Sequence, residues 1–446
     1  MIDADGHFFE YVPALDHYLR EEGVGDGMAG LMRHASFDGA ERWDALTPEE
    51  RAAQRPPRTP WWGTPMANTL DFATANAPRL LHSRLDELGI DFAVCYPSVG
   101  LLFPNQRDGD VRRACCRAMN RCAADIFTGL QDRMIPVAVI PMFDPDEAVA
   151  ELEHATGTLG FRAVMLGGFA VRPLEGGGEW VDHLGLDSAH DYDPVWRYLV
   201  EHGLSAAFHS GAMGWAGRRS VSNFSYNHMG HFGAASEATA KSLFFGGVFR
   251  RFPELRLAFL EGGVTWAVQM LVDLIGHYEK RGPEGIRAYD PSRLDAALFD
   301  RLMEEHGAPM KAVAGAGEFI KEGFGRAQVH EDFAASGVGG AEDIVRQVTT
   351  VCTFGCEADD PLTGIAFDTK RMPLGKELRA VFSSDIGHWD VPDMTEVLPE
   401  AYEHVEHGWL DARAFRRFLC DNAYRLYAET NPRFFEGTVL AGYRPA

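Results

Sequence analysis

The sequence predicts an α/β fold, a distorted (β/α)₈ TIM barrel, because strand-like and helical patterns alternate along most of the chain. From about residue 82, short runs rich in Val, Phe and Ile, each ending in Gly, Pro or Ser, have the composition of buried parallel strands. We expect strands at 91–99, 134–142, 161–168, 204–211, 255–263, 348–356 and 379–387. With one more strand within the first ten residues they number eight, which closes such a barrel.

The segments between these runs have the periodicity of amphipathic helices. Such patterns cover 110–132, 144–157, 193–203, 233–253, 265–282, 395–409 and 411–430. An open doubly wound sheet is the rival fold, but no Gly-x-Gly-x-x-Gly turn follows an early strand. The barrel is therefore the better prediction.

Two stretches depart from the alternation. Residues 25–80, rich in Pro, Trp and Thr near their end, predict an extended loop that wraps an active site or forms a subunit contact. Residues 283–345 contain helical patterns and predict an insertion between the sixth and seventh strands, either a cap or an oligomer element. We expect a single barrel domain over 1–446 that includes both stretches, and a homodimer or higher homo-oligomer.

Composition and charge narrow the class of partner. The chain of 446 residues is 46% hydrophobic and 24% charged, as expected of a globular protein with an ample core. Its net charge of −23 argues against nucleic-acid or anionic-membrane partners, which require basic patches. With no signal-peptide pattern and no apolar run of membrane-spanning length, we expect a cytoplasmic protein that acts on a small molecule.

The seven cysteines are odd in number and scattered through helical and strand-like segments. This distribution predicts reduced, mostly buried thiols rather than a disulfide framework. Cys352 and Cys356 have the spacing of a metal-binding pair, but no second cysteine pair lies near them in the sequence.

The first ten residues, MIDADGHFFE, carry the first candidates for a metal site. Side chains alternate between the two faces of a strand, so Asp3, Asp5 and His7 are expected to point the same way. Two carboxylates and an imidazole make a poor core face, whereas oxygen and imidazole ligands suit zinc, manganese or iron.

Three later strands end in residues of the same kind. His209 ends AAFHSG, Glu261 ends AFLEGG, and Asp385 follows VFSS. In a barrel, the C-terminal strand ends meet at the mouth, where active sites lie. A histidine or carboxylate at the end of an apolar run needs hydrogen-bond partners or a cation. A structural histidine and a helix cap are the alternatives for His209 and Asp385.

At this point the chain resembles the amidohydrolase superfamily, in the branch that includes aminocarboxymuconate-semialdehyde decarboxylase and resorcylate decarboxylases. The resemblance rests on DADGHFFE at 3–10, FHSG at 208–211, the run NHMGHFGAASEATAKSLFFGGVFRRFPELRLAFLEGGVTW at 227–266, and SSDIGHWD at 383–390. It implies a distorted barrel with one divalent metal, Zn²⁺ first and Mn²⁺ as the alternative. It also implies the metal ligands Asp5, His7, His209 and Asp385, with Asp3 a supporting partner or a cap.

One position departs from the family pattern. The decarboxylases of this branch carry a histidine at the end of the sixth strand, and here that position is Glu261. An ionised Glu261 could serve as a base towards water on the metal, and a neutral one could protonate a carbanion. Whether Glu261 also coordinates the metal stays open.

Several further residues are expected to complete the site. His228 and His231 open a helix after the fifth strand, and neutral imidazoles facing the site are the functional interpretation, with a solvated turn as the alternative. His388 could orient Asp385 or water on the metal. Arg218 could clamp a substrate carboxylate, and Trp61 and Trp62 could line a hydrophobic pocket.

The sequence therefore favours a metal-dependent hydrolase acting on a small, hydrophobic or aromatic substrate. Its catalytic residues would be Asp385, Glu261, His228 and His388, and Arg218, Trp61, Trp62 and His231 would bind substrate. The alternative is a non-oxidative decarboxylase of an aromatic or unsaturated carboxylic acid. A barrel that only binds or assembles is the third hypothesis, which the intact ligand positions disfavour.

Overall fold

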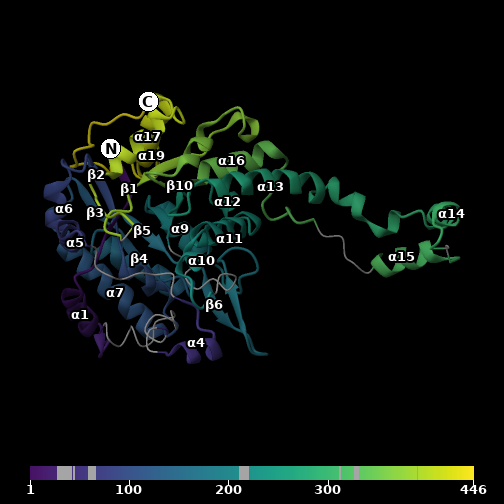
Figure 1. Cartoon of the computed structure of the whole chain (residues 1–446), viewed down its shortest axis with the longest axis horizontal. Coiled ribbons are helices and arrows are strands. Elements are labelled where there is room, and N and C mark those ends of the chain that lie inside the picture. The colour runs from purple at the N-terminus through teal and green to yellow at the C-terminus, as the bar shows by residue number, and fades with distance from the viewer. Residues whose placement is uncertain are drawn as a thin grey trace.

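The computed structural model describes residues 1–27, 43, 46–58, 67–209, 220–310, 313–325, 331–388 and 390–446. Its strands lie together in the body of the molecule, with helices packed around them (Figure 1). Trp61, Trp62 and Arg218, which we predicted to bind substrate, lie outside the described residues.

Parallel strands form the barrel wall. A first sheet has the order β1 (Ile2–Phe8), β2 (Phe92–Pro97), β3 (Met134–Pro136). A second has the order β11 (Arg379–Ser383), β10 (Cys352–Glu357), β9 (Leu257–Phe259), β8 (Ser205–Phe208), β5 (Ala163–Leu166), β4 (Ala138–Ile140). Only Val137 separates β3 from β4, and its N–H donates to the Cys95 carbonyl at 3.0 Å. Because β3 and β4 form one interrupted strand, eight strand positions follow one another.

The two ends of this series meet at β1 and β11. The Asp385 N–H donates to the Asp5 carbonyl at 3.1 Å, and the His7 N–H donates to the Ile386 carbonyl at 3.0 Å. These two hydrogen bonds join β1 to the residues that follow β11, at the position where regular strand pairing would close the barrel. The wall is thus a distorted (β/α)₈ barrel, as predicted, and its seam brings the first and last strands together.

Helices follow the strands as the periodicity predicts. They are α7 (Gly109–Ile126), α8 (Pro145–Leu152), α9 (Asp193–Glu201), α11 (His231–Phe245), α12 (Val248–Arg251), α13 (Thr265–Arg281), α17 (Val397–Glu406), α18 (Ala412–Arg416) and α19 (Asn422–Ala428). Helix α7 shows the local causes. The Asp108 side chain caps its first N–H groups, and Cys115, Met119 and Cys122 form part of its buried face.

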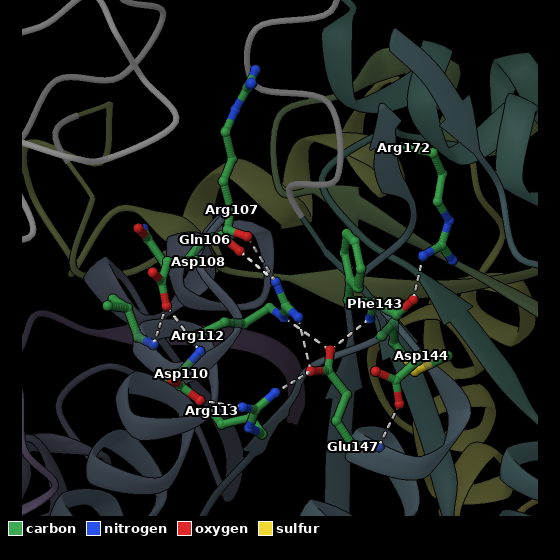
Figure 2. Close-up of polar contacts among 12 residues, drawn as sticks. Gln106, Arg107, Asp108, Asp110, Arg112, Arg113, Phe143, Asp144, Glu147 and Arg172 are labelled. Carbon is green, nitrogen blue, oxygen red and sulfur yellow. Dashed lines mark hydrogen bonds and ion pairs between the residues drawn. The ribbon is translucent and has the colours of Figure 1, made fainter. Parts of the chain in front are cut away.

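A buried arginine joins α7 to α8 (Figure 2). The Arg112 guanidinium donates to both oxygens of Glu147 at 2.9 Å and lies over the Phe143 ring, 4.3 Å from its centroid. Arg172 lies 4.6 Å from the same centroid and donates to the Phe143 carbonyl at 2.6 Å. Because the charges are paired and the hydrogen bonds are made, this cluster fixes α7 and α8 to the segment around Phe143.

One predicted strand boundary is wrong. The seventh strand was expected over 348–356, but Val348 to Val351 complete α16 (Ala341–Val351), and β10 begins at Cys352. Val345, Val348 and Val351 lie on the buried side of that helix. The β-branched run imitates a strand because one face of the helix is apolar throughout.

The described residues of the two stretches outside the alternation include several helices. Within 25–80 lie α4 (Pro48–Gln54), α5 (Thr69–Asn76) and the start of α6 (Pro78–Arg84), and α1 (Val12–Glu21) precedes them. Thr47 and Glu50 form a capping box at the start of α4. Whether the stretch contacts a substrate or a partner stays a prediction.

The insertion forms an arm. Helices α14 (Ala296–His306) and α15 (Ala316–Gly325) lie far from the barrel, beyond the end of α13 (Figure 1). Helix α14 buries none of its residues, and Leu302 and Phe319 are exposed. The arm's role as a cap or an oligomer element, like the single-domain organisation, stays a prediction.

The cysteines are as expected. All seven are free thiols, and all except Cys420 are buried. Among the described residues, no helix is both long enough and apolar enough to cross a membrane.

Candidate metal centre

Strand β1 carries the first ligand-type side chains into the barrel. Asp3, Asp5 and His7 are all fully buried. The pairing of β1 with β2 shifts register between Asp3 and Gly6, so the strict alternation expected of the strand does not hold. A Cβ at Gly6 would collide with the Asp3 carboxylate, so this position requires glycine.

Side chains from four strands meet in one buried region and form two overlapping groups of possible ligands: Asp5, His7, His209 and Glu261, and His7, Glu261, Asp385 and His388. His7 Nε2 and His209 Nε2 lie 3.2 Å apart, and Glu261 Oε1 lies 3.2 Å from the first and 3.3 Å from the second. Asp5 Oδ1 lies 3.3 Å from His209 Nε2, and Asp385 Oδ1 lies 3.4 Å from His7 Nε2. Of the predicted ligands, Asp5, His7 and His209 thus lie in one group with Glu261, whereas Asp385 lies in the second group, which shares His7 and Glu261 with the first.

These spacings fit a single divalent cation. Atoms that each lie about 2.0–2.2 Å from one ion are separated by about 3–3.5 Å. Among the described residues, both oxygens of Asp5 and of Glu261 have no hydrogen-bond partner, although all four are buried. Such orphans are costly in a protein interior unless a cation faces them. The mixture of imidazole and carboxylate is a donor set for zinc or manganese.

Glu261 and Asp385 reach this point from unusual backbone conformations. Their φ angles are +53° and +51°, in the left-handed region that residues other than glycine seldom adopt. Both stand directly after buried strands, at the mouth of the barrel. Backbone strain at such positions is typical of functional sites.

The charges of the cluster are strongly coupled. Burial lowers the pKa of His209, but the carboxylates of Glu261 and Asp5 outweigh it and raise that pKa to about 10. Burial raises the pKa of Glu261, but His209 and His7 outweigh it and hold that pKa well below its usual range. For Asp385, burial and then the Glu261 charge raise the pKa well above its usual range. A divalent cation would favour the ionised carboxylates and neutral imidazoles.

His388 lies against the cluster, as predicted. Its ring stacks on His7 at a centroid distance of 3.8 Å, and its Nδ1 lies 2.5 Å from Asp385 Oδ1. Burial, followed by the nearby His7, holds the pKa of His388 well below its usual range. The Ser98 hydroxyl lies 3.2 Å from its Nε2. Ser98 was missed, because a serine after a strand carries no signal in the sequence.

Two acidic residues support the cluster without joining it. Asp3 accepts hydrogen bonds from the Ser384 N–H and hydroxyl at 3.1 and 2.6 Å, and from the Asp5 N–H at 3.2 Å. It therefore fixes β1 to the end of β11, which agrees with a supporting role. Glu10 accepts from the N–H groups of Val99 and Gly100, both at 2.8 Å.

A cavity of about 310 Å³ adjoins the cluster. Its lining residues are His228, Gly230, Phe232, Gly233, Glu261, Gly262, Gly263, Glu357, Asp360, Asp385 and Asp390. Burial lowers the pKa of His228, so a neutral imidazole lines the cavity, as expected. His228 ends the short helix α10 (Phe224–His228) rather than opening a helix, and this expectation was wrong.

His231 begins α11 and is buried, with its Nδ1 against the His228 carbonyl. It is not among the lining residues, so its role in substrate binding stays a prediction.

Three carboxylates of this cavity were missed. Glu357 is the last residue of β10, and Asp360 and Asp390 lie in the loops after β10 and β11. Burial and then the Glu261 charge raise the pKa of Glu357 to about 8 and that of Asp390 to about 6. Glu357 could have been found by the strand-end argument, but the predicted strand stopped one residue before it.

The barrel and the cluster at its mouth define a metal-dependent enzyme of the amidohydrolase type. The sequence model of the amidohydrolase family matches residues 2–282, and the chain belongs to this family.

Solved structures share the fold. An amidohydrolase from Mycobacterium avium subsp. paratuberculosis K-10 is 18% identical, with a TM-score of 0.51 over 80% of this chain and 76% of that one. A dihydroxybenzoic acid decarboxylase from Polaromonas sp. JS666, solved with bound manganese, is 14% identical, with a TM-score of 0.51 over 98% of each chain. At these identities the likeness concerns the fold alone.

Proposed function

We propose that the protein is a metal-dependent hydrolase acting on a small, hydrophobic or aromatic substrate. The observation that carries this proposal is the convergence of His7 Nε2, His209 Nε2 and Glu261 Oε1 within 3.2–3.3 Å of one another in a buried site beside a cavity. Asp5, His7, His209 and Asp385 would hold one divalent metal, with Glu261 as a further ligand. A metal held by these residues would supply Lewis-acid chemistry, which activates water and polarises a carbonyl or similar bond.

The chain's own residues would handle the proton. Asp385 or Glu261 would accept it when water attacks the substrate, as the sequence suggested. Asp385 Oδ1 lies 2.5 Å from His388 Nδ1, so this buried imidazole would orient the Asp385 carboxyl group. His228 and Phe232 would border the substrate on the other side of the cavity.

Decarboxylation is the second candidate. The specific observation in its favour is the fold that the chain shares with a dihydroxybenzoic acid decarboxylase solved with bound manganese. The same metal would then chelate the carboxylate of an aromatic or unsaturated acid.

The identity of the metal, the cellular location and the oligomeric state are further proposals. Two imidazoles among the donors favour zinc, and the carboxylate-rich remainder makes manganese the alternative. We also propose a cytoplasmic homo-oligomer, on the charge of −23 and the exposed apolar side chains of the arm.

An assay of paired products tests the function. The protein loaded with zinc or manganese is incubated with a panel of aromatic amides, esters and carboxylic acids, while carbon dioxide and hydrolysis products are measured together. We expect hydrolysis that a chelator abolishes and added metal restores. Metal-dependent release of carbon dioxide without any hydrolysis product would overturn the hydrolase in favour of the decarboxylase.

A further inference from the structure

The cavity beside the metal cluster has an unusual wall. Five of its lining side chains are carboxylates, and none of the described lining residues is Lys or Arg. Glu261 and Asp385 lie at its base and are buried, whereas Glu357 and Asp390 are exposed at its mouth. The cavity thus leads from an open acidic mouth to the buried cluster.

The carboxylates of the wall come from three neighbouring strands. Strand β10 lies between β9 and β11 and ends in Glu357, whereas Glu261 and Asp385 lie two residues beyond the ends of β9 and β11. Because the strands are parallel, these ends share one edge of the barrel. The acidic wall is therefore built by the barrel itself.

Asp360 is fixed in place beside Glu357. Its Oδ1 accepts a hydrogen bond from the Leu362 N–H at 2.9 Å, which caps the turn Pro361–Phe367. A Cβ at Gly263 would lie 2.9 Å from its Oδ2, and Gly263 has a φ of +63°. Glycine at this position lets the carboxylate lie against the backbone that follows Glu261.

The charge of the outer wall is not compensated by the described part of the chain. No ion pair there joins Glu357, Asp360 or Asp390 to Lys, Arg or His. A single divalent cation bound by Glu261 and Asp385 cannot also neutralise the charge of the three other carboxyl groups of the cavity. Glu261, whose oxygens lack hydrogen-bond partners among the described residues, is buried and faces the same cavity. The cavity therefore offers one wall of carboxyl groups to whatever enters it, and a cation bound among them would favour their ionised forms.

We propose that the substrate carries a positively charged nitrogen group, an ammonium, amidinium or guanidinium, which Glu357 and Asp360 bind while the bond to be broken lies over the metal cluster. This inference rests on the proposed function and adds the class of substrate to it. Carboxylates are the natural partners of such cations, and Phe232 supplies an apolar surface beside them. A negatively charged substrate would meet the outer carboxylates before it reached the metal.

Three probes of nearly equal shape test the proposal: benzylammonium, benzyl alcohol and benzoate. Binding to the full-length protein is measured by calorimetry, after metal analysis has established one equivalent of zinc. We expect benzylammonium to bind at least about tenfold more tightly than benzyl alcohol, with an advantage that decreases at high salt. We expect benzoate to bind most weakly.

Variants locate the binding. Glu357→Gln and Asp360→Asn should each remove most of the advantage of benzylammonium, and Asp360→Asn retains the oxygen that caps the following turn. Asp359→Asn is the matched control, because Asp359 lies in the same loop but does not line the cavity. Thermal unfolding of each variant shows that it folds, and the rank order of the probes in the wild-type protein needs no variant.

Three outcomes would overturn the proposal. The first is that benzoate binds as tightly as benzylammonium. The second is that Asp359→Asn loses as much of the binding advantage of benzylammonium as Glu357→Gln and Asp360→Asn do. The third is that the protein binds a second equivalent of zinc, which Glu357→Gln abolishes. Failure of the proposed function is separate, since a zinc-loaded protein that hydrolyses nothing still shows the rank order of the three probes.

Discussion

The two sides of the barrel mouth differ in chemistry and in support. On one side, β1 and β8 supply His7 and His209, both buried, and Asp3 ties β1 to the end of β11 with hydrogen bonds. On the other side, β9, β10 and β11 end in carboxylates that line an open cavity. We infer that the imidazole side would only bind the metal, whereas the carboxylate side would supply the ligands Glu261 and Asp385 and also receive the substrate.

The largest effect is expected from the imidazole side. His209→Ala removes a nitrogen that lies 3.2–3.3 Å from three other prospective ligand atoms. We expect this variant to lose nearly all bound zinc or manganese and all activity, because a catalytic site seldom survives with one ligand fewer. Metal analysis after dialysis measures the loss.

His17→Ala is its control, since His17 is an exposed histidine with 68% of its side chain accessible. Equal metal content in His209→Ala and His17→Ala would show that the imidazole side does not hold the metal.

A smaller effect is expected where Asp3 supports the ligands. Asp3→Ala leaves the buried N–H groups of Ser384 and Asp5 without their acceptor. We expect a loss of about 2–4 kcal/mol in the free energy of unfolding, and about 10–100-fold weaker metal binding. Urea unfolding and metal titration measure the two effects. Asp3→Asn, which keeps one acceptor oxygen, should recover part of both, and a variant as stable as wild type would contradict this role.

Glu10 separates stability from metal binding. Glu10→Gln puts an amide NH₂ against the N–H of either Val99 or Gly100, which now donate to the two carboxylate oxygens at 2.8 Å. We expect a loss of about 1–3 kcal/mol in the free energy of unfolding with unchanged metal content. Loss of metal in this variant would place Glu10 within the site rather than beside it.

The smallest effect concerns pH on the carboxylate side. His404 is buried, its Nε2 lies 3.0 Å from the carbonyl oxygen of Ala358, next to Glu357, and burial lowers its pKa below the ordinary 6.5. Below that pH the unfolded chain binds the proton more readily than the folded protein, so stability falls as pH decreases. Urea unfolding at about pH 7.5 and about pH 5.5 should show a smaller difference in His404→Gln than in wild type. An equal or larger difference would contradict this origin.

The sequence predicted the barrel and the ligand positions for physical reasons. Buried strands and amphipathic helices leave periodic patterns, and a histidine or carboxylate at the end of an apolar run is conspicuous, as at His209 and Asp385. The resemblance to a known family strengthened the prediction that Asp5 and His7 are metal ligands. The structure places both side chains in the cluster.

What the sequence could not predict depends on contacts between distant segments. The bond of Ser98 to His388 joins residues 290 positions apart, and nothing local in the sequence marks Ser98. Glu261 reaches His7 and His209 from a left-handed backbone, which a glutamate followed by two glycines does not reveal. Glu357 was missed because the valines of α16 shifted the predicted strand towards the N-terminus.

Anomalous diffraction from crystals grown with zinc or manganese tests most directly whether the cluster of His7, His209 and Glu261 binds one divalent metal. We expect one anomalous difference peak from the metal, about 2.0–2.2 Å from His7 Nε2 and His209 Nε2, with an oxygen of Glu261 also in its coordination sphere. A peak elsewhere, or no peak at this point in crystals whose protein retains the metal, would contradict it.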